Sequence, residues 1–382
     1  MEKKIRLMIV DDSIVFRSWL MQNLGADPRF EVVGYAVNAL DAKNKLPVLN
    51  PDIMTLDIEM PGMTGLEFLK EVLPTHPVPV ILVSSLNVKV FDALAAGAID
   101  FVRKPSTEIG GKEAFLATLK SKLSIGANAK VRLPASASFS SRSISSHAAS
   151  TPYGTATSAN AALNTTSVTA ASHGTLPSGI GAGKVPFMNS NIDLIAIGAS
   201  TGGTEAILEV VRQFPARMPG IVITQHMPPG FTAMYAERLN RICKLEVKEA
   251  AHGDKVQPGL ILLAPGGLQM RVVRLGSGYS VTCTNEAKVS GHRPSVDVLF
   301  DSVATNVKSR AIGVILTGMG ADGAMGMLRM RKAGAYTIGQ DRETCVVYGM
   351  PMEAYKIGGV CQQAALSTIP QVVMAQLAKA KG

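Results

Sequence analysis

The sequence is poor in cysteine and in aromatic residues. Its 382 residues include 4 cysteines and one tryptophan, and aromatic side chains make up 5% of the chain. The cysteines lie far apart and form no Cys-x-x-Cys pair, which argues against a disulfide framework and a zinc knuckle. The chain also lacks a Lys/Arg-rich helix and an aromatic-basic stripe, so we expect no nucleic-acid partner.

Long apolar runs are absent as well. Although 47% of the residues are hydrophobic, no uninterrupted stretch is long enough to span a bilayer. The charged start, Met1-Glu2-Lys3-Lys4, does not lead into a signal-peptide pattern. We therefore expect a cytoplasmic protein that is not integral to a membrane.

Acidic residues are missing from one long segment. Residues 125–190 contain no Asp or Glu and are dominated by Ser, Ala, Thr, Gly and Asn. Such a segment cannot bury enough apolar surface to offset its ordering entropy. The composition predicts a flexible linker over 125–190 between domains at 1–124 and 191–382. Most of the net charge of +9 lies after this linker. A basic domain could favour nucleic acid and fits an acidic protein substrate equally well, so the charge alone does not decide between them.

The first domain alternates short apolar runs with amphipathic stretches. This alternation predicts a doubly wound α/β domain with a five-stranded parallel sheet. In such sheets, functional side chains gather at the carboxyl ends of the strands. The predicted strands cover residues 5–10, 31–36, 53–56, 80–83 and 101–102.

Three acidic side chains follow two of these strands. Asp11 and Asp12 come directly after the first strand, and Asp57 follows the third. Three converging carboxylates repel one another, so the cluster suits a hard cation such as Mg²⁺. Ser84 and Lys104 follow the fourth and fifth strands and could contact a phosphoryl group. Any single Asp could instead be a helix cap or a turn residue.

This set of residues resembles the receiver domain of two-component response regulators, over about residues 4–123. The resemblance implies that Asp57 accepts a phosphoryl group from a histidine kinase and that Ser84 and Lys104 contact it. It also implies a Mg²⁺ site formed by Asp11, Asp12, Asp57 and the backbone of Glu59.

The second domain repeats the alternation of strands and helices. Its predicted strands, 194–197, 221–224, 260–263, 312–316 and 335–338, indicate a second doubly wound, Rossmann-like parallel sheet. The segment Gly198-Ala199-Ser200-Thr201-Gly202 ends the first of them and is typical of a nucleophile elbow. A helix-capping hydroxyl or a phosphate cradle is the alternative. The Gly-x-Gly-x-x-Gly spacing is lacking, so we expect no cofactor in this domain.

A serine nucleophile needs a base and a carboxylate. His226 follows the next strand along the chain, and Asp322 follows the strand at 312–316, so both should emerge at the sheet edge that carries Ser200. His292 follows no clear strand and is a reserve base or a substrate contact. Asp297 is expected on a helix surface.

The order of these residues along the chain is informative. Enzymes of the α/β-hydrolase fold place their triad as Ser…Asp…His, whereas this chain has Ser…His…Asp, which indicates another scaffold. The glycine-rich segment 318–320 could offer backbone N–H groups to an oxyanion, with Met319 as the preferred donor.

Five strings, IGASTGG, TQHMPPGF, LAPGG, GHRPSVD and LTGMGADGA, lie behind the receiver-like domain and the linker. Together they resemble the chemotaxis response-regulator protein-glutamate methylesterase family (CheB). The resemblance implies hydrolysis of γ-glutamyl methyl esters on methyl-accepting chemotaxis receptors, and deamidation of receptor glutamines. It maps Ser200, His226 and Asp322 onto the triad and Met319 onto the oxyanion loop. A phospho-switched esterase or amidase on a small molecule and a non-enzymatic response regulator are the alternatives.

Overall fold

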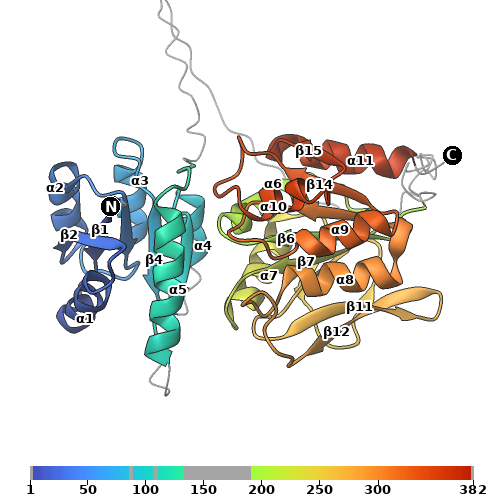
Figure 1. Cartoon of the computed structure of the whole chain (residues 1–382), viewed down its shortest axis with the longest axis horizontal. Helices are drawn as coiled ribbons and strands as arrows, with labels where there is room; N and C mark the ends of the chain where they lie inside the picture. The colour runs from blue at the N-terminus through green and yellow to red at the C-terminus, as the bar shows by residue number, and fades with distance from the viewer. Residues whose placement is uncertain (1–2, 86–88, 106–110, 133–190, 380–382) are drawn as a thin grey trace, which may run out of the picture. The chain divides into compact units, whose positions relative to one another are not determined.

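A computed structural model describes residues 3–85, 89–105, 111–132 and 191–379 of the chain (Figure 1). Most of the predicted linker, residues 133–190, lies outside the described residues, so the linker and the domain boundaries stay predictions. Within the described ranges, no helix is both long enough and apolar enough to cross a membrane.

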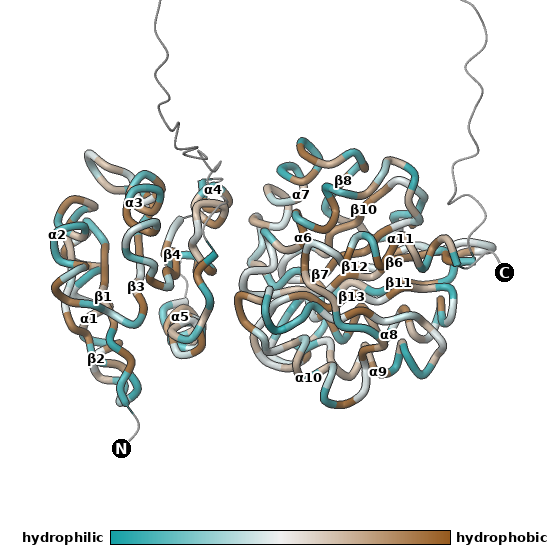
Figure 2. The backbone as a smooth tube through the Cα atoms, turned by 90° about the horizontal axis from the view of Figure 1, so that it is seen from above, coloured by the Kyte–Doolittle hydropathy of each residue, from teal (hydrophilic) through white to brown (hydrophobic). Residues whose placement is uncertain are grey.

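The N-terminal domain contains a five-stranded sheet in the order β2-β1-β3-β4-β5, with all neighbours parallel. Figure 2 shows hydrophobic residues along β1 and β3 in the middle of this sheet, as expected for strands that are covered on both faces. The strands are β1 (Ile5–Val10), β2 (Phe30–Ala36), β3 (Ile53–Leu56), β4 (Val80–Ser84) and β5 (Asp100–Arg103). The predicted sheet is confirmed.

Five helices cover the two faces of this sheet. Leu20 and Leu24 of α1 and Leu119 and Leu123 of α5 are buried in one apolar cluster on one face, and α2, α3 and α4 bury their apolar residues on the other. Hydrogen bonds to capping side chains fix the ends of helices, as at Thr64, which forms a capping box at the N-terminus of α3. The helices are α1 (Ile14–Gly25), α2 (Ala39–Leu49), α3 (Gly65–Val72), α4 (Lys89–Ala95) and α5 (Gly111–Gly126).

The C-terminal domain is built on a seven-stranded parallel sheet in the order β15-β14-β13-β6-β7-β10-β8. The five strands predicted from apolar runs all lie in it, at positions that agree within two residues. The strands are β6 (Leu194–Ala199), β7 (Gly220–Gln225), β8 (Glu246–Glu249), β10 (Leu260–Leu263), β13 (Ala311–Ile315), β14 (Tyr336–Gln340) and β15 (Gln362–Ala364).

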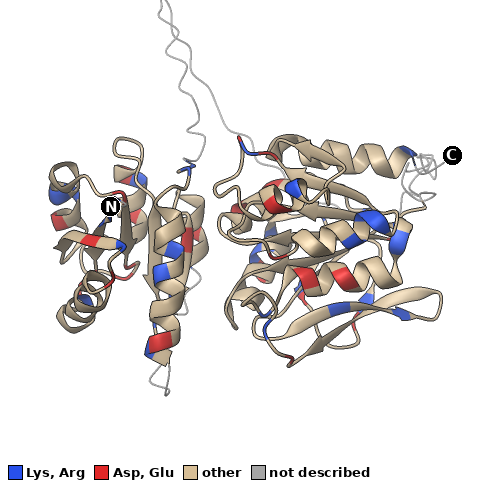
Figure 3. Ribbon diagram, in the orientation of Figure 1, with Lys and Arg blue, Asp and Glu red and all other residues tan. Residues whose placement is uncertain are grey.

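Helices again lie on both faces of this sheet. α6, α7 and α11 bury their apolar sides in one cluster, and α8, α9 and α10 in another. The last turn of α9 carries three basic residues, a favourable arrangement at the negative end of a helix dipole (Figure 3). The elements are α6 (Gly203–Val211), α7 (Phe231–Ile242), α8 (Val296–Asn306), η2 (Lys308–Arg310), α9 (Ala324–Lys332), α10 (Met350–Lys356), η3 (Leu366–Thr368) and α11 (Ile369–Lys379).

A second, antiparallel sheet of three strands was not predicted from the sequence. Its order is β11-β12-β9, with β9 (Lys255–Val256), β11 (Gln269–Leu275) and β12 (Gly278–Thr284). β11 and β12 form a hairpin that packs on α8 through Met270 and Val272. This hairpin therefore supports the helix whose first turn reaches the candidate site.

Both parallel sheets have a switch point where the chain changes direction across the sheet. In the N-terminal domain it lies between the neighbours β1 and β3, and in the C-terminal domain between β6 and β13. Loops on either side of such a point leave in opposite directions and open a crevice at the carboxyl ends of the strands. The candidate residues Asp11, Asp57, Ser200 and Asp322 all follow these four strands.

Candidate functional site

Ser200 occupies a tight turn between β6 and α6. Its backbone N–H donates to the carbonyl of Thr317 at 3.0 Å, and its own carbonyl accepts from the N–H of Gly203 at 2.7 Å. Gly202 has φ +74°, a conformation that glycine adopts easily. It is also the N-cap of α6, so the helix begins without a capping side chain, and the Ser200 hydroxyl is paired with His226.

The imidazole of His226 bridges the other two candidate residues. Its Nδ1 lies 3.1 Å from Ser200 Oγ, and its Nε2 lies 2.7 Å from Asp322 Oδ2. A carboxylate can only accept, so Nε2 carries the proton and Nδ1 of the neutral ring is free to accept the serine proton. The ring is thus turned relative to chymotrypsin-type proteases, where Nε2 faces the serine.

Asp322 is held at the N-terminus of α8, with 3% of its surface exposed. Ser295 Oγ donates to its Oδ1 at 2.8 Å, the N–H of Val296 donates to Oδ2 at 2.7 Å, and the N–H of Asp297 donates to Oδ1 at 3.1 Å. Burial alone would raise the pKa of Asp322, but the hydrogen bond and charge of His226, together with the hydrogen bonds from Ser295 and Val296, lower it. The carboxylate is therefore ionised and fixed in place beside the imidazole.

The loop after β13 passes close to the serine. A Cβ built on Gly318 would lie 2.9 Å from Ser200 Cβ, so only a glycine leaves room for this approach. The loop is tied down by Thr317, whose N–H donates to Gln340 Oε1 at 2.7 Å and whose hydroxyl donates to the carbonyl of Thr201 at 3.0 Å. Met319 follows in this loop and is half-buried.

The structure places two further residues, Asp297 and His292, near the triad. Asp297 was expected on a helix surface, and this was wrong: it is 7% exposed because α9 packs on α8, and its Oδ1 accepts from the N–H of Gly326 at 2.6 Å. Burial raises the pKa of Asp297 to about 6. His292, which the sequence left open as a reserve base or a substrate contact, stacks on the ring of His226. Sequence reasoning missed Ser295; the only available signal was a hydroxyl before a helix pattern.

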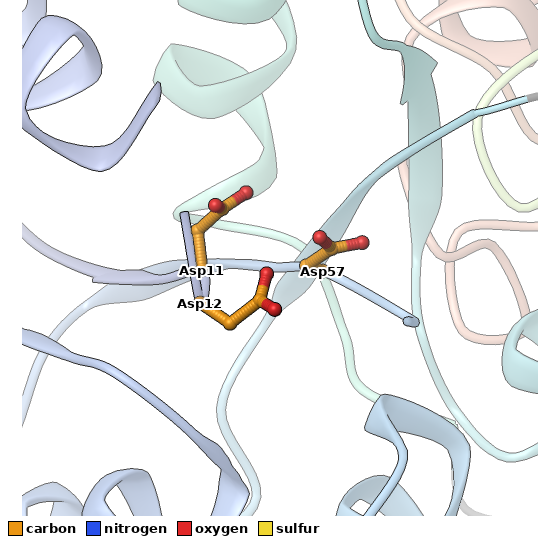
Figure 4. A group of neighbouring side chains, drawn as sticks. All are labelled: Asp11, Asp12 and Asp57. Carbon is orange, nitrogen blue, oxygen red and sulfur yellow. The ribbon is translucent and has the colours of Figure 1, made fainter. Parts of the chain in front are cut away.

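The acidic cluster of the N-terminal domain comes together as predicted. Carboxylate oxygens of Asp11, Asp12 and Asp57 lie within 4.8 Å of one another (Figure 4). Asp11 and Asp57 are buried, and burial raises the pKa of Asp11 despite the nearby Lys104. Glu59 follows two residues after Asp57 and its N–H donates to Asp57 Oδ1 at 3.2 Å. All-oxygen donors at this spacing are compatible with Mg²⁺.

Lys104 and Ser84 also reach this cluster's sheet edge. Lys104 Nζ lies 2.6 Å from Asp57 Oδ2 and 3.1 Å from Asp11 Oδ2. Burial alone would lower the pKa of Lys104, but its hydrogen bond to Asp57 and the two carboxylate charges raise it, so the ammonium is charged. Ser84 Oγ is buried and, among the described residues, has no hydrogen-bond partner. An orphaned hydroxyl there fits a site that is completed by a ligand.

Comparison with family models divides the chain into the same two domains as the two parallel sheets do. Residues 7–114 match the response regulator receiver domain, and residues 195–373 match the CheB methylesterase domain. The crystal structure of the Thermotoga maritima CheB methylesterase catalytic domain is similar at 36% identity; the match covers 48% of this chain and 98% of that chain, with a TM-score of 0.47.

Full-length relatives carry the family assignment. A protein-glutamate methylesterase/protein-glutamine glutaminase of Syntrophotalea carbinolica is 46% identical over 98% of this chain and 98% of its own length. A protein with the same description from Escherichia coli O6:K15:H31 is 43% identical, over 98% and 97% respectively. The chain belongs to the CheB methylesterase family and carries the family's catalytic domain behind a response regulator receiver domain.

Proposed function

We propose that this chain hydrolyses glutamate γ-methyl esters on chemotaxis receptors, with Ser200 as nucleophile, His226 as base and Asp322 as its carboxylate partner. The observation that carries the proposal is the continuous path from Ser200 Oγ to His226 Nδ1, 3.1 Å, and from His226 Nε2 to Asp322, 2.7 Å. The names of the full-length relatives support the choice of substrate. We place this activity in the cytoplasm, on the signalling helices of the receptors.

The reaction begins with a proton transfer within this path. His226 Nδ1 takes the Ser200 proton as Oγ attacks the ester carbonyl. The ionised Asp322 stabilises the positive imidazolium that results. The N–H of Met319, in the loop that passes Ser200, is proposed to donate to the developing oxyanion.

Collapse of the tetrahedral intermediate releases the leaving group. His226 returns its proton to the methoxide, methanol departs, and Ser200 keeps the glutamyl group as an ester. Water activated by His226 then attacks this acyl-enzyme and frees glutamate. Glutamine follows the same steps with ammonia as the leaving group, so one site accounts for both the esterase and the glutaminase activity.

The receiver domain is proposed to regulate this activity through Asp57. A histidine kinase donates a phosphoryl group to the Asp57 carboxylate, and Lys104 and Ser84 contact it there. Asp11, Asp12, Asp57 and the backbone carbonyl of Glu59 would hold Mg²⁺, which when bound neutralises the negative charge of the phosphoryl oxygens. Phosphorylation shifts the protein toward a state in which the catalytic site is accessible.

A fluorophosphonate probe tests the triad in the full-length protein. The probe reacts with an activated serine, so mass spectrometry should find one adduct, at Ser200. Labelling should be lost in Ser200→Ala and strongly slowed in His226→Ala. A protein that is never labelled would favour a binding module, and a Ser200→Ala variant that is labelled as fast as the natural chain would remove Ser200 as nucleophile.

A further inference from the structure

We propose that His292 is a positioning residue for the reaction: its ring covers one face of the His226 imidazole and holds that ring in the plane that aims Nδ1 at Ser200. The proposal rests on the proposed function of His226 as the base. It gives His292 a role that differs from those of a reserve base and of a substrate contact.

The two imidazoles are stacked face to face. Their ring centroids are 3.7 Å apart, and their planes are inclined by 9°. The hydrogen bonds of His226 to Ser200 and Asp322 involve only the edges of its ring. Such edge contacts restrain the χ2 torsion, which is soft in histidine, but they oppose small tilts of the ring only weakly. A flat ring in van der Waals contact with one face opposes that tilt.

His292 is itself held by its backbone. Its N–H donates to the carbonyl of Val289 at 2.9 Å, and its carbonyl accepts from the N–H of Val289 at 3.1 Å. The two residues between them, Ser290 and Gly291, have φ +52° and +81°, values typical of a tight type I′ turn. The turn fixes the backbone from which the His292 ring projects.

A buried glutamine connects this turn to the residues around Asp322. Gln269 is fully buried; its Nε2 donates to the carbonyl of His292 at 3.1 Å, and its Oε1 accepts from the N–H of Ser295 at 2.8 Å. Ser295 in turn donates to Asp322. A single segment of chain, residues 289–297, therefore contacts both the face of the base and the carboxylate that orients it.

The charge state of His292 suits this role. The pKa of His292 is lowered to about 4, mainly by burial and secondly by the positive charge that His226 can carry. The ring is therefore neutral at neutral pH and does not compete with His226 for the serine proton. When His226 takes that proton, the positive imidazolium lies against a neutral aromatic face, which is a favourable cation–π arrangement, and that face is shielded from water.

Three full-length variants test the proposal: His292→Ala, which removes the ring; His292→Phe, which keeps a flat neutral ring; and His252→Ala, a control at an exposed turn histidine. Methanol release from methylated receptor is measured and divided by the sites that a fluorophosphonate titrates. This division removes any loss of folded protein from the comparison.

We expect His292→Ala to lower kcat about 10- to 100-fold with KM within about twofold, because a misplaced base affects the transition state more than binding. His292→Phe should recover most of the lost kcat, and His252→Ala should match the natural chain. The proton NMR signal of His226 Nε2–H should broaden in His292→Ala and sharpen again in His292→Phe.

Two results would overturn the proposal while leaving the proposed function intact. One is an unchanged kcat per titrated site in His292→Ala. The other is a raised KM in both His292 variants with no recovery in His292→Phe, which would make His292 a substrate contact. A natural chain whose Ser200 is not labelled would instead remove the proposed function, and this inference with it.

Discussion

Replacing Ser295 by alanine removes one of four hydrogen bonds that the Asp322 carboxylate accepts among the described residues. Ser295 is fully buried and has two tasks. Its hydroxyl donates to Asp322 Oδ1 at 2.8 Å, and the same oxygen accepts from the N–H of Val298 at 3.4 Å as the N-cap of α8. The substitution therefore affects both the stability of the fold and the orientation of the carboxylate.

The size of each effect follows from these bonds. A hydrogen bond to a buried charged group contributes about 1.5–3 kcal/mol, and a helix N-cap about 0.5–2 kcal/mol. The free energy of unfolding should thus fall by about 2–5 kcal/mol in Ser295→Ala. If about 1.4 kcal/mol of this loss also destabilises the transition state, in which His226 is positively charged, kcat falls about tenfold.

Ser302→Ala is the matched control for this experiment. Ser302 is buried in the same helix, donates to the carbonyl of Leu299 at 2.6 Å and accepts from the N–H of Val272 at 2.8 Å, with no contact to Asp322 in the structure as described. Both variants should unfold at lower urea concentration, but only Ser295→Ala should lose kcat per titrated site. Equal kcat in the two variants would refute the idea that Ser295 orients Asp322.

Three further predictions concern other parts of the chain. The pKa of Asp297 is about 6 when folded and about 3.8 ordinarily, so the folded state is favoured by the protonated carboxyl. In urea titrations the natural chain should therefore lose about 2 to 2.5 kcal/mol of stability relative to Asp297→Asn as pH rises from 4 to 7; a constant difference would contradict this. Gly318→Ala, whose Cβ would lie 2.9 Å from Ser200 Cβ, should lower kcat about 100-fold with KM little changed in methanol-release assays. Binding of Mg²⁺ should change the fluorescence of Trp19, because Trp19 stacks on Phe16 and Lys104 lies over the Phe16 ring. Asp12→Asn should raise the Mg²⁺ concentration needed for this change at least tenfold; the same concentration in both proteins would place Mg²⁺ elsewhere.

The meeting of Ser200, His226 and Asp322 could be anticipated because each follows a strand of one parallel sheet. The carboxyl ends of such strands share one edge of the sheet. The positions of the apolar runs and of the residues just after them were therefore enough to predict that the three side chains meet. The same reasoning brought Asp11, Asp12 and Asp57 together. Their roles in catalysis and phosphoryl transfer stay predictions.

The environment of the triad could not be read in this way. His292 and Ser295 lie in a turn and a helix start that follow an antiparallel hairpin, and no apolar run places that segment relative to the sheet. The ring orientation of His226 depends on the position of Asp322 at the N-terminus of α8, which only the packing of α8 determines. Asp297 is buried because α9 covers it, and a single helix pattern contains no information about its neighbour.

Methanol release from methylated chemotaxis receptor is the most direct test of the central claim, that Ser200 attacks glutamyl methyl esters of these receptors. The full-length protein is compared with Ser200→Ala, with a small phosphodonor present and the two proteins at equal folded concentration. We predict steady methanol release by the natural chain and release by Ser200→Ala no faster than in buffer. Equal release by the two proteins, or none by a natural chain that still hydrolyses simple esters, would contradict the account.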